Sequence, residues 1–322
     1  MKIAIITPAA ASSRTGNRHT AARYAKFLRK HNQQARIMVE WDGSPCDLMI
    51  ALHARRSLAS IKAYREGFPA QPLIVVLTGT DVYRDIHSNP EARASLHRAD
   101  RLIVLQERAL DELTKAERVK VDVVYQSCDT ALTHAPIARR FRIASLGHLR
   151  DEKDPFCIAR ALAFASASEL EVVQVGDALT DADRTQALAW MQRDLRYRWI
   201  GGRPHGNALR WLASSHVMVL SSRMEGGANV ICEAARIGVP VIASKVSGNI
   251  GMLGPQYAGY YPLSDEEALA RVIERARTDQ SFYRLMQAQL RQRRPLFMPT
   301  SEANGLLASV RTAVAVARTR YR

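Results

Sequence analysis

Two carboxylates, Glu225 and Glu233, stand where a strand-like run gives way to a helix-like one. A glycine pair, Gly226 and Gly227, lies between them, and glycines let a backbone approach a ligand closely. The main-chain amides that open the helix are a ready site for an anion, and they belong to Ala228, Asn229 and Val230. The pattern offers a candidate anion site, but the spacing taken alone does not favour it over the structural alternative. The alternative is a plain strand–turn–helix in which Glu225 caps the helix and Glu233 faces solvent.

Two cations, Arg150 and Lys153, follow the first strand-like run in the second half of the chain. Fixed positive groups in such a loop can stabilise negative charge on a departing phosphate or diphosphate. Taken alone, the two are better interpreted as a solvated loop pair. The D-x-D sequence at 181–183 could in principle hold a metal ion. Because it stands just before a helical run, where acids cap the helix and complement its dipole, we predict a cap there and no metal site.

The first half of the chain offers a second set of polar residues. A loop between the first strand-like run and a helix suits a small anion, and it holds Arg14, Thr15, Gly16, Asn17, Arg18 and His19. His53 ends an apolar strand, and Asp81 follows a Thr-Gly-Thr turn. Each feature also has a structural interpretation: an exposed basic loop, a core histidine and the cap of the next helix.

Short apolar runs that alternate with amphipathic helical segments must position these residues. We predict strands at residues 2–7, 35–39, 47–52, 72–78, 101–105, 121–125, 141–146, 170–176, 197–201, 216–221 and 240–243. Such alternation indicates parallel sheets covered by helices, and ligands bind these sheets at the carboxyl ends of the strands. Residues 127–140 lack periodicity, which is typical of a linker between two domains. We predict an α/β fold of two Rossmann-like, doubly wound domains, 1–138 and 139–300, with a C-terminal helix at 301–322 packed on them.

The composition is that of a soluble globular protein, with 47% hydrophobic and 24% charged residues. A formal net charge of +15 favours anionic partners, yet the cations are spread along the chain and aromatic residues make up only 7%. We expect small anionic substrates, with a basic nucleic-acid-binding protein as the alternative. Four scattered cysteines and the lack of a long apolar run indicate reduced thiols, a cytoplasmic location and no stable membrane association.

Two motifs together resemble retaining glycosyltransferases of family 4. The segment 221–240 resembles their E-x7-E signature, and 146–155 resembles their Arg-x-x-Lys pair. The resemblance implies the GT-B fold, in which two Rossmann-like domains face a central cleft. It also implies a UDP-sugar donor and no metal or other cofactor.

The resemblance assigns a role to several residues. Arg150 and Lys153 would hold the donor diphosphate. Glu233 would bind the ribose, and Glu225 and His53 would contact the donor sugar. The uracil pocket would follow the strand at 197–201, beside Gly202 and Arg203.

A narrower resemblance covers almost the whole chain. Six stretches are similar to the selenosugar synthases of selenoneine biosynthesis: residues 8–20, 51–57, 76–86, 124–127, 224–230 and 248–254. That subfamily joins selenophosphate to the sugar of a UDP-sugar through a carbon–selenium bond. The chain departs from family 4 in two glycine positions, having one glycine, Gly16, in the first loop and Gly248-Asn249 in place of a later pair. These departures argue against an ordinary hydroxyl acceptor.

We expect selenophosphate to bind at the 14–19 loop, because its main-chain amides, hydroxyl and cations suit a small tetrahedral anion, and Asp81 is a further candidate. A site near Arg55, Asp81 and Arg84 is the alternative place. Because selenophosphate is an anionic, soft nucleophile, we expect no catalytic base. The alternative function is a family 4-type transferase with a hydroxyl acceptor. The choice between UDP-N-acetylglucosamine and UDP-glucose stays open, as does the oligomeric state.

Overall fold

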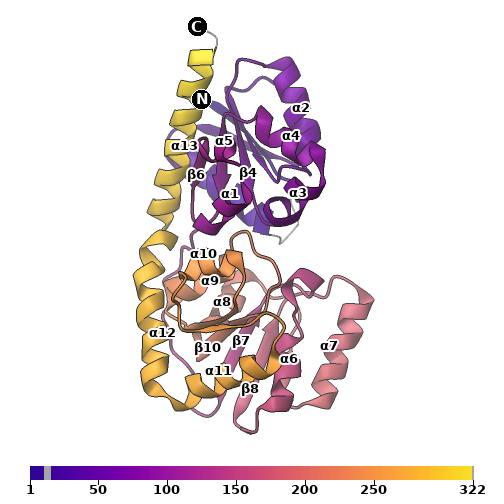
Figure 1. Cartoon of the computed structure of the whole chain (residues 1–322), viewed down its shortest axis with the longest axis vertical. Coiled ribbons are helices and arrows are strands. Elements are labelled where there is room, and N and C mark those ends of the chain that lie inside the picture. Colours follow the sequence, from indigo (N-terminus) through magenta and orange to yellow (C-terminus); the bar gives the residue numbers. More distant parts are fainter. Residues whose placement is uncertain (11–15, 321–322) are drawn as a thin grey trace. The chain divides into compact units, whose positions relative to one another are not determined.

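The protein consists of two compact units, seen here in a computed structural model that describes residues 1–10 and 16–320 (Figure 1). The first unit combines Met1–Gln126 with Pro299–Arg322, and the second is Ser127–Met298. Each unit contains one six-stranded sheet. All strand pairs within the sheets are parallel, which confirms the predicted α/β architecture.

The first sheet has the strand order β2-β1-β3-β4-β5-β6. Its strands are β1 (Lys2–Ile6), β2 (Gln34–Met38), β3 (Leu48–Leu52), β4 (Leu73–Leu77), β5 (Arg101–Val104) and β6 (Val121–Val123). The helices of this unit are α1 (Gly16–Lys30), α2 (Leu58–Gly67), α3 (Ile86–Ser88), α4 (Pro90–Arg98), α5 (Lys115–Arg118) and α13 (Pro299–Arg320), with a π-helical turn η1 (Asp81–Asp85) and a 3₁₀ helix η2 (Glu107–Glu112).

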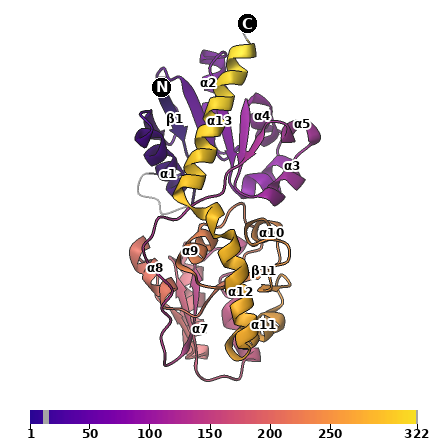
Figure 2. The ribbon, with the colours of Figure 1, turned by 90° about the vertical axis from the view of Figure 1, so that its left-hand side faces the viewer.

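Both faces of the first sheet are covered, because its central strands are apolar at every position. Side chains alternate along a strand, so Ile3 and Ile5 pack on the face that α1 and α13 cover. Their neighbours Ala4 and Ile6 pack on the opposite face, against α2 and α4. Figure 2 shows α13 crossing the sheet beside α1.

The second sheet has the order β12-β11-β10-β7-β8-β9. Its strands are β7 (Phe141–Leu146), β8 (Leu170–Val175), β9 (Tyr197–Trp199), β10 (Val217–Leu220), β11 (Val241–Ser244) and β12 (Tyr260–Tyr261). The helices are α6 (Cys157–Ala161), α7 (Asp181–Arg193), α8 (His205–Ala213), α9 (Asn229–Ile237), α10 (Ser247–Leu253), α11 (Glu266–Thr278) and α12 (Gln280–Arg293), with 3₁₀ helices η3 (Asp151–Lys153), η4 (Leu162–Phe164) and η5 (Arg294–Phe297).

Two local features are not evident from the sequence. The segment between β5 and β6 is divided into η2 and α5, because Thr114 begins a new helix through a reciprocal capping box with Glu117. The two-residue strand β12 was not predicted, since so short a run carries no periodicity.

The boundaries of the two units differ from the predicted domain boundaries. Residues 127–138, which the sequence assigns to the first domain, belong to the second unit. Main-chain hydrogen bonds hold them there: the His134 N–H donates to the Ile237 carbonyl at 3.0 Å, and the Ala135 N–H donates to the Ala213 carbonyl at 2.9 Å. The chain then returns to the first unit at Pro299, where α13 begins.

The C-terminal helix α13 is an integral part of the first unit. Leu306 and Val310 are buried among the side chains of α1 and the strands. The fully buried Glu302 accepts from the Arg23 guanidinium at 2.9 Å, which ties α13 to α1. The Arg320 guanidinium also bonds to the buried Asp100. This helix therefore completes the core of the unit.

Replacing Leu306 by alanine should destabilise the first unit, because the substitution leaves a cavity under α13. Leu306 is 0% exposed, and such truncations cost about 2–5 kcal/mol. The free energy of unfolding from urea denaturation measures the effect. Thr312→Ala, on the exposed side of α13, is the control and should stay within about 0.5 kcal/mol of the unmodified protein. Equal losses for the two variants would show that α13 does not contribute to the core.

Candidate functional site

The strand order of the second sheet reverses between β7 and β10, which are neighbours although far apart in sequence. Chain segments leave such a pair toward opposite sides, so a crevice opens at the carboxyl ends of the two strands. The loop after β7 contains Arg150 and Lys153, and the loop after β10 contains Glu225. The topology of one unit therefore brings the two predicted motifs together.

Lys153 and Glu225 form a direct ion pair between the two loops. Glu225 is 7% exposed, and its Oε1 also accepts from the Ser222 hydroxyl at 2.5 Å. A nearly buried carboxylate needs a cation and hydrogen-bond donors to offset its desolvation, and these two residues supply both. The sequence predicted separate roles for Lys153 and Glu225, and it did not predict their pairing.

A second set of contacts ties the same two loops together. The Arg223 N–H donates to the Glu152 carbonyl at 2.9 Å, and the Arg223 guanidinium lies 3.4 Å from Asp151. It also lies 3.5 Å from the buried Asp154, which the Arg160 guanidinium holds by two bonds of 3.0 Å. The β7 loop is thus fixed to the β10 loop through both main chain and side chains.

Helix α9 begins directly after Glu225 and the glycine pair. Ala228 occupies its N-cap position and offers no side-chain cap, and the first turn contains no acidic residue. The positive end of the helix dipole is therefore not neutralised from within the helix. Gly238 ends the helix in a left-handed conformation with φ of 98°. The predicted residues Gly226 to Val230 thus form a loop and helix start suited to an anion.

Glu233 has a partner that the sequence did not reveal. Its Oε1 lies 2.9 Å from Nε2 of His205, the first residue of α8. Glu233 is mostly buried and His205 is mostly exposed. Because α8 and α9 are separated by β10 in the sequence, this contact could be found only from the packing of the two helices. Arg203, predicted for the uracil pocket, is exposed in the loop just before α8.

Glycines allow two close approaches at this end of the sheet. A Cβ added at Gly248 would lie 1.7 Å from the Glu225 carbonyl oxygen, so α10 packs its first turn directly on the Glu225 loop. A Cβ at Gly202 would lie 1.9 Å from a carboxylate oxygen of Asp177. A larger side chain at Gly248 would displace the backbone of the Glu225 loop, whereas at Gly202 the Asp177 side chain would have to move.

Arg150 differs from Lys153 in its surroundings. Its side chain is exposed, and none of the described residues forms an ion pair or side-chain hydrogen bond with it. It stands immediately before η3, in the loop that follows β7. The guanidinium is therefore available to a ligand without the loss of a protein contact.

In the first unit, His53 and Asp81 lie side by side within the protein. His53 has a φ of 74°, which is uncommon for a residue other than glycine, and its Nε2 lies 3.1 Å from the Thr80 hydroxyl. Burial lowers the pKa of the His53 imidazole below its usual range, although the neighbouring Asp81 acts to raise it. Backbone strain at a buried histidine is typical of functional positions.

Asp81 is occupied by structural bonds. One carboxylate oxygen accepts from the Thr78 and Gly79 N–H groups at 2.8 Å each, and the other accepts from the Ala54 N–H at 3.1 Å. It joins the loops after β3 and β4 and so has a structural role, while its contact with the acceptor stays a prediction.

The structure describes only part of the 14–19 loop that was predicted to bind the acceptor. Arg14 and Thr15 lie outside the described residues, whereas Gly16, Asn17, Arg18 and His19 form the first turn of α1. The alternative place contains Arg55 and Arg84, whose guanidinium groups lie 2.8 Å and 3.3 Å from Asp85. Burial acts to raise the pKa of Asp85, but its hydrogen bonds to these arginines hold that pKa below the usual range.

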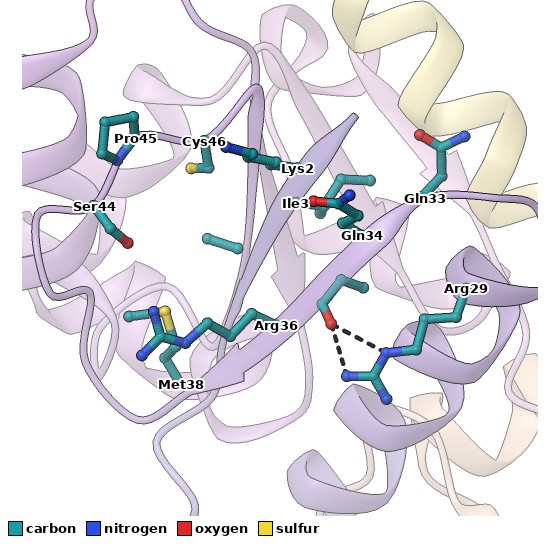
Figure 3. A pocket seen from close by; sticks show the side chains of 12 residues that line it. Lys2, Ile3, Arg29, Gln33, Gln34, Arg36, Met38, Ser44, Pro45 and Cys46 are labelled. Atoms are coloured by element: carbon teal, nitrogen blue, oxygen red, sulfur yellow. Dashed lines mark hydrogen bonds between the residues drawn. The ribbon is translucent and has the colours of Figure 1, made fainter.

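A cavity of about 430 Å³ lies along the edge strand β2, lined also by residues of β1 and the segment 44–46 (Figure 3). None of the predicted site residues lines it. Arg29 donates from Nε and Nη2 to the Ala35 carbonyl at 3.1 Å and 2.7 Å, which satisfies a main-chain acceptor of this edge strand. The cavity is therefore separate from the site between β7 and β10.

The D-x-D sequence caps α7, as predicted. Thr180 Oγ1 accepts from the Asp183 N–H at 3.1 Å, and Asp183 accepts from the Thr180 N–H at 3.1 Å. Within residues 1–10 and 16–320, no group of three or more His, Cys, Asp or Glu side chains is arranged to hold a metal ion.

No described helix has the length and apolar character to cross a bilayer.

Replacing Gly248 by alanine should disturb Glu225, since the new Cβ would overlap its carbonyl oxygen. Backbone cannot yield as a flexible side chain can, so we expect the melting temperature to fall and ligand binding at Glu225 to be lost. Differential scanning calorimetry measures the first effect, and titration with the anionic ligand expected at this site measures the second. Gly206→Ala is the matched control, because no atom lies within 4 Å of its added Cβ. Wild-type binding by Gly248→Ala would show that this close approach is unimportant.

Comparisons with known proteins agree with this geometry. Residues 134–293 match the family described as Glycosyl transferases group 1. No curated protein matches the sequence. Among solved structures, the chain is similar to HepE of Anabaena in complex with UDP, with a TM-score of 0.78 and 17% identity over 97% of this chain and 100% of that chain.

Two further structures show the same fold. Sucrose-phosphate synthase of Thermosynechococcus elongatus has a TM-score of 0.79 and 18% identity, covering 98% of this chain and 99% of that chain. The lipopolysaccharide outer core galactosyltransferase WaaB has a TM-score of 0.70 and 16% identity, covering 97% and 99%. Residues 134–293 are therefore a glycosyl transferases group 1 domain, in a chain that has the GT-B fold of glycosyltransferases.

Proposed function

We propose that the protein transfers the sugar of a UDP-sugar to selenophosphate, forming a carbon–selenium bond and releasing UDP. The observation that carries the donor half is the site between β7 and β10. There the Lys153–Glu225 pair, the exposed Arg150 and the uncapped start of α9 stand together in a glycosyl transferases group 1 domain. The similar HepE structures contain UDP or UDP-glucose, which supports a UDP-sugar as donor.

The donor reaction requires positive groups near the leaving diphosphate. As the bond between the anomeric carbon and the diphosphate oxygen breaks, its electron pair passes to the UDP. Arg150, Lys153 and the first amides of α9 are fixed groups that stabilise this charge. Glu233 binds the ribose hydroxyls and Glu225 the sugar in this proposal. No metal ion or other cofactor is needed, because cations and amides of the chain take its place.

The acceptor half rests on the sequence resemblance to selenosugar synthases. Selenophosphate brings its own electron pair on selenium, so the new bond to the anomeric carbon forms without removal of a proton by the protein. The start of α1, with Gly16 to His19 and the preceding Arg14 and Thr15, is the proposed selenophosphate site. Asp81, whose carboxylate accepts three main-chain bonds, is a further candidate for this site.

The test is an assay of purified protein with selenophosphate and either UDP-glucose or UDP-N-acetylglucosamine. We expect mass spectrometry to detect a selenosugar in amounts equal to the UDP released, and EDTA to leave the rate unchanged. UDP release with a sugar hydroxyl acceptor, and none with selenophosphate, would replace the acceptor assignment. An absolute requirement for a divalent ion would contradict the metal-free mechanism.

Arg150→Ala is the variant that tests the donor site within this assay. Its side chain has no partner among the described residues, so its removal should lower turnover without destabilising the fold. The loss of one charge-assisted bond corresponds to about 10–150-fold. Arg271→Ala is the matched control, because Arg271 pairs only with an exposed glutamate on α11. Lys153→Ala is a less direct test of the donor site, since it also leaves the nearly buried Glu225 without its cation.

A further inference from the structure

The two oxygens of the Glu225 carboxylate have different surroundings. Oε1 accepts from the Ser222 hydroxyl at 2.5 Å and from the Lys153 ammonium group. Oε2 receives no hydrogen bond from any residue that the structure describes. The carboxylate is thus bound on one side and open on the other.

Ser222 is itself held by a buried chain of hydrogen bonds. The Ser244 hydroxyl donates to the Ser222 carbonyl at 2.6 Å, and the Asn249 amide donates to the Ser244 carbonyl at 2.9 Å and hydroxyl at 3.1 Å. Ser222, Ser244 and Asn249 are all 0% exposed. They come from the ends of β10 and β11 and from α10, so three successive segments fix the main chain from which the Ser222 hydroxyl projects.

This chain restricts how Glu225 can turn. A carboxylate rotates readily about its last bond unless a donor selects one oxygen, and a hydroxyl fixed from behind selects Oε1. With Oε1 shared by two donors, Oε2 is the oxygen that has no donor among the described residues. Gly248 closes off the main-chain side of Glu225, because its α-carbon packs against the Glu225 carbonyl.

We propose that Ser222 is a positioning residue that turns Glu225 so that Oε2 accepts a hydroxyl of the donor sugar while Oε1 keeps Lys153 in place. The proposal rests on the proposed function, in that it takes the ligand to be a UDP-sugar. Its specific content is that Ser222 affects recognition of the sugar and acts only through Glu225.

A simpler role for Ser222 would be to stabilise the β10 loop, since Ser222 and Glu225 are three residues apart. A loop-stabilising hydroxyl would affect all ligands of the site equally. It would also keep its effect when the Glu225 side chain is absent. The two roles therefore differ in measurable ways.

The experiment compares affinities for UDP and for the UDP-sugar by isothermal titration calorimetry, which requires no acceptor. For Ser222→Ala we expect the UDP-sugar to bind about tenfold more weakly and UDP to bind unchanged, since one bond to a charged group is lost. Ser244→Ala, which frees the Ser222 carbonyl, should give a smaller loss of the same kind. Ser215→Ala is the control, because it removes another fully buried hydroxyl of the same unit, bonded to the Trp211 carbonyl at 2.8 Å.

The double variant distinguishes the positioning role of Ser222 from the loop-stabilising role. In a Glu225→Ala background, Ser222→Ala should cause no further loss of UDP-sugar affinity. Equal weakening of UDP and UDP-sugar, or an undiminished loss in that background, would overturn the positioning role while leaving the donor assignment intact. If the unmodified protein binds neither UDP nor a UDP-sugar, the proposed function fails and this inference fails with it.

Discussion

The candidate site of the second unit depends on the nearly buried carboxylate of Glu225. Glu225 lies at the carboxyl end of β10 with little access to water, and the desolvation of its charge has to be offset by nearby donors. Lys153 supplies the cation from the loop after β7, and Ser222 supplies a hydroxyl from the loop after β10. Because the two loops lie on adjacent strands, one ion pair both stabilises the charge and joins the two motifs.

The strand order explains why this meeting occurs. In the second sheet β7 stands between β8 and β10, so the polypeptide continues to opposite sides of the sheet after β7 and after β10. The segments that follow these strands carry Arg150 and the start of α9. An anion placed there would meet an exposed guanidinium and the positive end of a helix dipole. The charged groups, which would be costly in a closed core, therefore lie at the carboxyl ends of β7 and β10.

Much of this arrangement could be predicted from the sequence, and the exceptions have a common cause. Strand β7 was predicted with its correct bounds, and the resemblance to glycosyltransferases identified Lys153 and Glu225. The pairing of these two, the contact between His205 and Glu233, and the approach of Gly248 to Glu225 depend on distances between segments far apart in sequence. No local pattern records such distances. Asp81 shows the same limit, since its three main-chain donors come from two different loops.

The central claim is that the loops after β7 and β10 form the binding site for the diphosphate of a UDP-sugar. A crystal structure of the protein with UDP tests it most directly. We predict the diphosphate at the start of α9, within hydrogen-bond distance of Arg150 or Lys153, and the ribose hydroxyls beside Glu233. Electron density for UDP elsewhere in the protein, with the Lys153–Glu225 pair and the α9 start free of ligand, would contradict the account.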